Sequence, residues 1–254
     1  MFEGLRPNRI TCQSDFDRLC LISLFRSRQR QDVIQNMSNI RPSPIFIADA
    51  KGLDFLNSLA TPVDTPVEWL GSGADLLAWL KEARLVPNEV LKNFNETAGP
   101  GELDAVAAQA RALREWFRSF VYKHKGKPLK TGALQQLDSL NRVLAREEAF
   151  GQIVARGRDH ELGKKRKQRE QSASGLVWLS QRRWRSPDAL LLPIAHAMAE
   201  VICTEDFTHI KACEGHACTL IFADHTHSRA RRWCSMAVCG NRAKQAAIRE
   251  RARR

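Results

Sequence analysis

The hydrophobic residues of this chain recur mostly at helical spacing. Between about Glu102 and Tyr122 they repeat every three or four residues, which places them on one face of a helix. The stripe consists of Leu103, Val106, Ala110, Leu113, Phe117 and Phe120. An apolar face of this length has to be buried against other elements, so we expect it to form part of a core and not a cofactor-binding surface.

Three further segments have the same period, and we expect them to be core helices. They are a helix capped by Ser72 with Leu76, Leu77 and Leu80, a helix from about Gly132 with Leu134, Leu137, Leu140 and Leu144, and a helix after Pro187 with Leu191, Ile194, Ala195, Met198 and Ile202. The capping residue can accept a hydrogen bond from the first turn of its helix. Cys203 follows the last stripe and is expected to be a buried free thiol.

Two short runs have the composition of β-strands instead, at 152–155 and 176–179. Between them lies the basic sequence Lys-Lys-Arg-Lys-Gln-Arg at 164–169, which suits the exposed tip of a hairpin or a solvated loop. The pattern therefore predicts a small β-hairpin within a mainly helical chain.

Residues 1–36 differ from the rest, because they contain six Arg, no Lys and no sustained period. Met37 is followed by a polar sequence of the kind that often begins a protein. Two hypotheses fit: a disordered extension, or a start assigned too far upstream. We assign no function to this segment.

The chain is basic, with 40 Lys+Arg against 28 Asp+Glu and a formal net charge of +12. This balance favours a polyanionic partner, although a soluble protein can be basic without one. No stretch approaches the ~18–20 uncharged apolar residues of a membrane span, and no basic-then-apolar leader begins the chain. We therefore expect a cytoplasmic protein with no membrane partner.

Four of the seven cysteines form two equally spaced pairs near the end of the chain, Cys213 with Cys218 and Cys234 with Cys239. A four-residue gap lets two thiolates of one turn reach the same ion, and two such pairs complete the tetrahedral shell of zinc. Four sulfur ligands leave no open position, so one structural Zn2+ is expected. A module of ~40 residues also needs the free energy of metal binding in order to fold.

Other interpretations of these cysteines remain open. A thiol–disulfide pair is the main alternative. A nearby histidine could replace one cysteine as a ligand, the candidates being His209, His216, His225 and His227. An iron–sulfur cluster fits less well, because its cysteines are usually more closely spaced.

The residues around the second pair closely resemble the CGNR zinc finger family. The resemblance is carried by Phe-Ala-Asp at 222–224, Arg-Ala-Arg-Arg-Trp-Cys-Ser-Met at 229–236 and Cys-Gly-Asn-Arg-Ala-Lys at 239–244. It implies that the metal ligands are Cys213, Cys218, Cys234 and Cys239, in agreement with their spacing. His225 departs from the family pattern, in which a small polar or basic residue follows the aspartate.

Upstream, Gly52-Leu-Asp-Phe-Leu-Asn57 and the helix-rich body resemble the ABATE domain that precedes such fingers in bacterial proteins. The two resemblances imply a stress-linked transcription regulator. They give an ABATE-like helical domain at 45–204 and a CGNR-type finger with a basic tail at 208–254, and they leave the extension at 1–36 outside. The expected fold is mainly α, or α+β only through the small hairpin, and ends in a basic helix.

Most of the net charge lies in the finger and its tail. Residues 211–254 contain ten Lys+Arg and three Asp+Glu, so they contribute +7, of which a four-thiolate zinc site offsets about −2. As a helix, the tail places Arg242, Arg249 and Arg253 on one face and Lys244 and Arg251 opposite. Such a helix suits a major groove with phosphates on both flanks, and a solvated basic end is the alternative.

The candidate nucleic-acid-binding residues are Arg229, Arg231, Arg232, Arg242, Lys244, Arg249, Arg251 and Arg253. Arg242 is the strongest candidate for a specific contact, because it follows the last ligand and the metal fixes its backbone. Its alternative role is to brace the finger, by pairing with Asp224 or a main-chain carbonyl. Trp233 is expected to form the small core of the finger and not to stack on a base.

No phosphate-binding glycine loop, nucleophile elbow or helical His-Glu metal motif occurs, so we do not expect an enzyme. Three classes remain: a DNA-binding regulator, an RNA-binding protein, and a zinc-stapled protein-interaction module. A small-molecule effector and a homodimer are further partners that the sequence leaves open. Asp54 and Asn57 could bind an effector, although bracing a turn is the favoured role for them.

Overall fold

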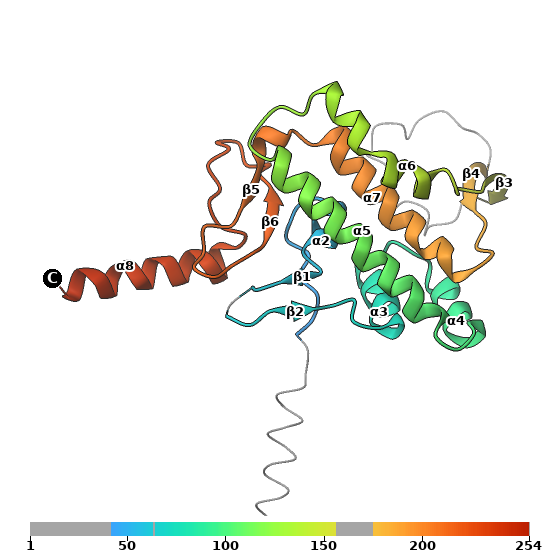
Figure 1. Ribbon diagram of the computed structural model, residues 1–254, viewed down its shortest axis with the longest axis horizontal. Coiled ribbons are helices and arrows are strands. Elements are labelled where there is room, and N and C mark those ends of the chain that lie inside the picture. Colours follow the sequence, from blue (N-terminus) through green and yellow to red (C-terminus); the bar gives the residue numbers. More distant parts are fainter. Residues whose placement is uncertain (1–41, 63, 156–174, 254) are drawn as a thin grey trace, which may run out of the picture. The chain divides into compact units, whose positions relative to one another are not determined.

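Helices account for most of the fold, as the hydrophobic pattern predicts. The computed structural model describes residues 42–62, 64–155 and 175–253, and residues 44–254 form one compact unit (Figure 1). The extension at 1–36 and the basic run at 164–169 lie outside the described residues.

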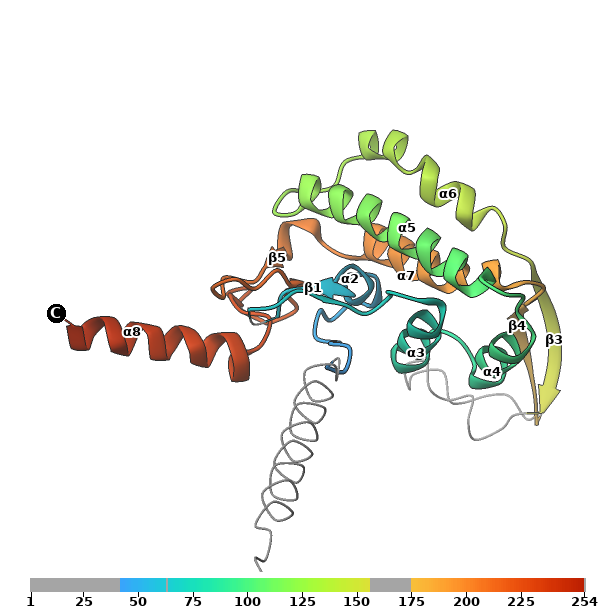
Figure 2. The ribbon, with the colours of Figure 1, turned by 60° about the horizontal axis from the view of Figure 1, so that its bottom comes forward.

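Two long helices form the centre of the core, α5 (Glu102–His124) and α7 (Leu191–Thr204). They lie side by side in both views, and the short helix α2 (Lys51–Leu56) packs against each (Figures 1 and 2). A Cβ atom at Gly52 would lie 2.5 Å from the carbonyl oxygen of Ala197, so glycine lets the backbones of α2 and α7 touch. Pro187–Thr204 is the one described helical stretch with the length and hydropathy of a membrane span, and its window is 61% buried inside the protein.

The predicted helix capped by Ser72 is α3 (Gly73–Ala83). The Ser72 hydroxyl accepts a hydrogen bond from the Asp75 main-chain N–H, and the Asp75 carboxylate accepts one in return from Ser72 N–H. This reciprocal cap satisfies two donors of the first turn. Helix α4 (Asn88–Thr97) follows, and the stripe predicted on α5 is buried from Val106 to Phe120.

The prediction of one continuous leucine stripe from Gly132 is wrong. The segment divides into a 3-10 helix (Thr131–Gln136) and α6 (Asp138–Leu144), and the change of period turns Leu134 outward, where it is 64% exposed. Cys203 is a free thiol, but it is exposed and not buried, because α7 turns it away from the buried face.

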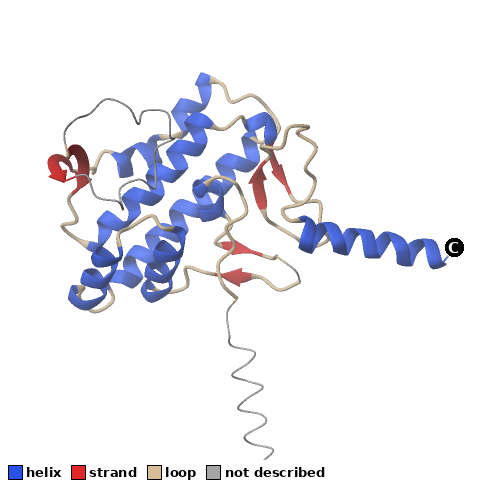
Figure 3. Ribbon diagram, turned by 180° about the vertical axis from the view of Figure 1, so that it is seen from behind, coloured by secondary structure: helices blue, strands red, loops and turns tan. Residues whose placement is uncertain are grey.

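Three antiparallel hairpins complete the described part of the fold (Figure 3). The predicted one pairs β3 (Ala149–Ala155) with β4 (Leu176–Arg182). The other two were not expected from the sequence, because their strands are only two or three residues long. They pair β1 (Leu59–Ala60) with β2 (Val67–Glu68), and β5 (Ile210–Ala212) with β6 (Ile221–Ala223).

Strand β6 joins the C-terminal segment to the helical body. The Asn57 side-chain amide donates to the carbonyl oxygen of Ile221 at 2.8 Å, and its oxygen accepts from the Ile221 N–H at 3.0 Å. Next to this pair, Ala223 N–H donates to the carbonyl oxygen of Ala48. Asn57 is 2% exposed, so water does not compete for these hydrogen bonds.

We expect Asn57→Ala to lower the free energy of unfolding by about 2–4 kcal/mol, because it leaves a buried N–H and a buried C=O of Ile221 without a partner. Urea denaturation of the two proteins measures the difference. Asn95→Ala, on the exposed side of α4, is the matched control and should change stability by no more than about 0.5 kcal/mol. Equal losses in the two variants would contradict the role given to Asn57.

Candidate metal centre and nucleic-acid interface

The four predicted ligands come together in the structure. The sulfur atoms of Cys213, Cys218, Cys234 and Cys239 all lie within 4.8 Å of one another. The first two belong to the turn between β5 and β6. Cys234 lies two residues before a π-helical turn (Met236–Gly240) that leads into α8 (Asn241–Arg253), and Cys239 lies within that turn.

The spacing of these sulfur atoms fits a tetrahedral metal. The distance is 3.8 Å from Cys218 Sγ to Cys234 Sγ and 3.6 Å from Cys234 Sγ to Cys239 Sγ. A zinc–sulfur bond of about 2.3 Å gives a tetrahedron with edges of about 3.8 Å. A disulfide needs about 2.05 Å, so these pairs are not bonded to each other. Among the described residues, no histidine joins the cluster.

The pKa values of Cys213, Cys218 and Cys234 are shifted in different directions. A hydrogen bond from the Cys234 thiol lowers the pKa of Cys218 to about 5, whereas the same contact and burial raise the pKa of Cys234 far above its usual value. Burial also raises the pKa of Cys213. Four thiolates cannot share this half-buried space without a counter-charge. A dication supplies that charge, so the chemistry of these residues fits a bound metal ion.

The surroundings of the cluster hold the sulfur atoms in place. The main-chain N–H groups of Gly215 and Cys234 each donate to Cys213 Sγ at 3.3 Å. A Cβ atom at Gly215 would lie 2.8 Å from Cys239 Sγ, so the turn requires glycine there. Ala217, next to Cys218, adopts a left-handed backbone with φ of 60°. Hydrogen bonds of this kind orient metal ligands, and the spacing of the cysteines alone did not reveal them.

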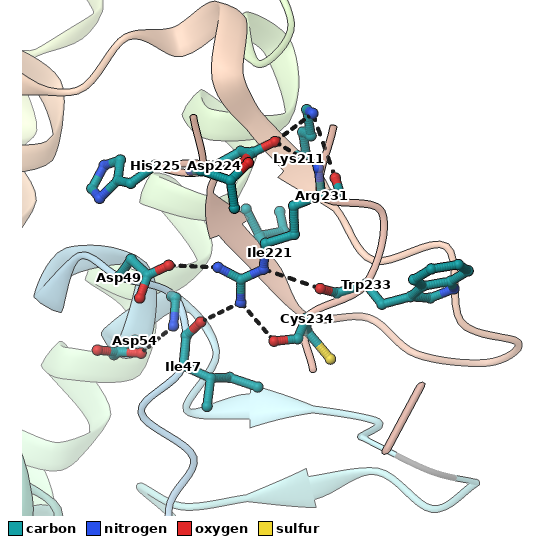
Figure 4. Close-up of polar contacts among 12 residues, drawn as sticks. Ile47, Asp49, Asp54, Lys211, Ile221, Asp224, His225, Arg231, Trp233 and Cys234 are labelled. Carbon is teal, nitrogen blue, oxygen red and sulfur yellow. Dashed lines mark hydrogen bonds and ion pairs between the residues drawn. The ribbon is translucent and has the colours of Figure 1, made fainter. Parts of the chain in front are cut away.

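Arg231 connects the cysteine cluster to the helical body (Figure 4). Its guanidinium donates to the carboxylate of Asp49 at 2.5 Å and to the carbonyl oxygens of Ile47, Trp233 and Cys234 at 2.9, 3.1 and 2.6 Å. It also lies 4.2 Å above the Phe222 ring centroid. These acceptors occupy its donor groups, so the prediction that Arg231 binds nucleic acid is not supported by its position.

Asp224 is fully buried beside Arg231. Its carboxylate accepts from Lys211 Nζ at 2.7 Å, from both donor groups of Thr226, and from the Arg231 N–H. Although burial by itself raises the pKa of Asp224, these donors hold it well below its usual value. Asp224 therefore stays charged and organises the loop that leads to Cys234.

Asp54 and Asn57 hydrogen-bond to main-chain groups, in agreement with the favoured interpretation that they brace the backbone. These contacts do not indicate an effector site. Asp54 Oδ1 accepts from the Ala48 N–H at 3.0 Å, beside the point where Ala48 meets β6. Burial raises the pKa of Asp54 to about 6.

Three other predicted nucleic-acid contacts are also occupied within the protein. Arg229 donates to the carbonyl oxygen of Asp224, and Arg232 pairs with Glu214 at 2.6 Å. Arg242 donates to Cys239 Sγ at 3.3 Å and to the carbonyl oxygen of Pro62 at 3.0 Å. The alternative role predicted for Arg242 is thus the one its contacts support, with Pro62 and not Asp224 as its oxygen partner.

The remaining four candidates share one helix. Lys244, Arg249, Arg251 and Arg253 are exposed on α8, which leads away from the body and has no buried residue (Figures 1 and 2). None of them forms an ion pair within the described part of the chain. Their charge is therefore available to a partner.

Trp233 is half-buried against the core of the finger, as predicted, and Arg232 lies 4.9 Å from its ring centroid. It also lines a hollow of about 490 Å³ together with Met236 and Ser235. The hollow lies beside the cysteine cluster and opens to solvent.

Comparison with known families gives two matches, which adjoin along the chain. The family ABATE, described as "Putative stress-induced transcription regulator", matches residues 49–205, and the CGNR zinc finger matches residues 209–252. No curated protein matches the chain. The finger family and the clustered cysteines together support a bound metal.

Arg242→Ala should lower the melting temperature by about 2–5 °C and speed the loss of metal to a chelator, because Cys239 Sγ loses a donor and the finger loses its contact with Pro62. Calorimetry and a chelator-competition assay measure the two effects. Arg249→Ala, which removes an exposed arginine from the same helix, is the control and should change neither. If both variants behave like the unchanged protein, Arg242 does not brace the finger.

Proposed function

We propose that this chain, because it belongs to the ABATE family and ends in a CGNR zinc finger, is a cytoplasmic transcription regulator that binds DNA through its C-terminal helix. The observation that carries the proposal is the set of four exposed cations on α8 that form no ion pair with the described residues. Cys239 of the cysteine cluster lies two residues before this helix, and Arg231 connects the cluster to the body.

A helix of 13 residues without buried side chains is only marginally stable in water by itself. An exposed helix of this kind suits contact with a partner outside the chain. The partner of a helix with five Lys+Arg and one Asp+Glu is a polyanion. RNA-binding and protein-docking are the competing functions, and the experiment on salt dependence below separates them.

The metal in this proposal is one structural zinc ion per chain. Native mass spectrometry should give one zinc, and Cys239→Ser should lose it, because three sulfur ligands no longer close the shell. The C-terminal module should then lose its structure. Cys203→Ser, which changes an exposed cysteine outside the cluster, should keep the full zinc content. A protein whose C-terminal module stays folded without metal would contradict a structural site.

Duplex DNA should bind with an affinity that falls steeply with salt. Arg249→Gln and Arg251→Gln should each weaken binding to all sequences alike and reduce the slope of log K against log[salt] by about one. Fluorescence anisotropy with a labelled duplex at several salt concentrations measures the slopes.

Lys81→Gln is the matched control, because it removes an exposed cation from α3 on the body. It should leave the slope unchanged. Tighter binding to single-stranded RNA than to duplex DNA would favour the RNA-binding function. Binding of neither, together with salt-independent capture of a protein, would favour a docking module.

A further inference from the structure

The two basic flanks of α8 enclose a face without charge. At about 100° per residue, Arg249 and Arg253 lie on one side of the helix, and Lys244 and Arg251 lie on the other. Between them, within an arc of about 60°, come Asn241, Gln245, Ile248 and Ala252. All four are exposed, and Ile248 is 64% exposed.

We propose that α8 is a recognition helix that reads A·T base pairs in the major groove through Asn241, Gln245, Ile248 and Ala252. This inference rests on the proposed function, because it assumes that the helix binds DNA. It adds which face of the helix meets the bases and which base pairs that face selects.

The side chains of this face have the chemistry that A·T pairs present. The amide of Gln245 can donate to N7 or accept from the N6 amino group of adenine, and a two-pronged contact uses one amide donor and one acceptor. The methyl groups of Ile248 and Ala252 suit the C5-methyl group of thymine. The Gln245 side chain makes no hydrogen bond with the described part of the chain, whereas the Asn241 side-chain amide donates to the carbonyl oxygen of Ala237 at 3.2 Å and keeps its oxygen available.

The opposite face of α8 is unsuited to this role. It carries Ala243, Ala246, Ala247 and Glu250. If that face entered the groove, the carboxylate of Glu250 at its centre would be repelled by the surrounding phosphates. Ala243 is also half-buried. The charge pattern therefore selects the face with the two amides.

The dimensions of the helix fit B-form DNA. Thirteen residues span about 20 Å, and a helix with its side chains is about 10–12 Å wide, which matches the major groove of about 12 Å. The flanking cations then face the phosphates on the two rims. The major groove of A-form RNA is too narrow to admit a helix, so the geometry favours duplex DNA.

The test uses the zinc-loaded full chain and selection of bound duplexes from a random DNA library. The unchanged protein should select a short site containing A·T pairs. Gln245→Ala should lose discrimination at one base pair, by roughly tenfold or more in relative affinity. Its salt slope should stay the same, since no cation is removed. Alanine is a better helix former than glutamine, so the variant keeps its helix.

Ala246→Gln is the matched control, because it places the same amide one residue along and about 100° around the helix. It should leave the selected site unchanged. Retained selectivity in Gln245→Ala, or lost selectivity in Ala246→Gln, would overturn the proposed reading face. Salt-dependent DNA binding without any sequence preference would overturn this inference alone, whereas no duplex binding would overturn the proposed function as well.

Discussion

The guanidinium of Arg231 is the contact on which the C-terminal half of this protein depends. It joins Ile47 and Asp49 of the body to Trp233 and Cys234 of the finger, and Phe222 lies beneath it. A planar group with five donors can satisfy main-chain carbonyls on both sides at once, whereas an ammonium group has only three donors. Because one of these carbonyls belongs to Cys234, the position of the cysteine cluster depends on the body as well as on the finger.

These contacts of Arg231, together the joint between the body and the finger, explain why the two family matches correspond to one compact unit. A zinc finger that stands alone derives its stability from the metal. Here, β6 also exchanges hydrogen bonds with Asn57 inside the body, and Arg242 reaches from the first turn of α8 to Pro62. The direction of α8 is thus determined by contacts from both segments, and a change in the body could alter how the helix is presented.

The helices were predictable because their signal is local. The stripe on α5, the cap at Ser72 and the cysteine spacing each depend on residues a few positions apart. The contacts that the arginines make within the protein were not predictable in this way. Arg231 and Arg242 find their partners 184 and 180 residues away in sequence, at Ile47 and Pro62, and no periodicity records such distances. A basic cluster therefore indicated where the charge lies, but not which charges the protein itself uses.

The buried carboxyl of Asp54 gives this joint an unusual response to acid. Because its pKa rises to about 6 on folding, from an ordinary value of 3.8, the chain takes up a proton as it folds between about pH 4 and pH 6. The contribution of Asp54 to stability is largest below its ordinary pKa and is lost as the pH rises through about 6. Asp224, whose pKa is lowered, contributes in the opposite sense, and its contribution is lost as the pH falls. Mild acidification thus strengthens the body side of the joint before it weakens the finger side.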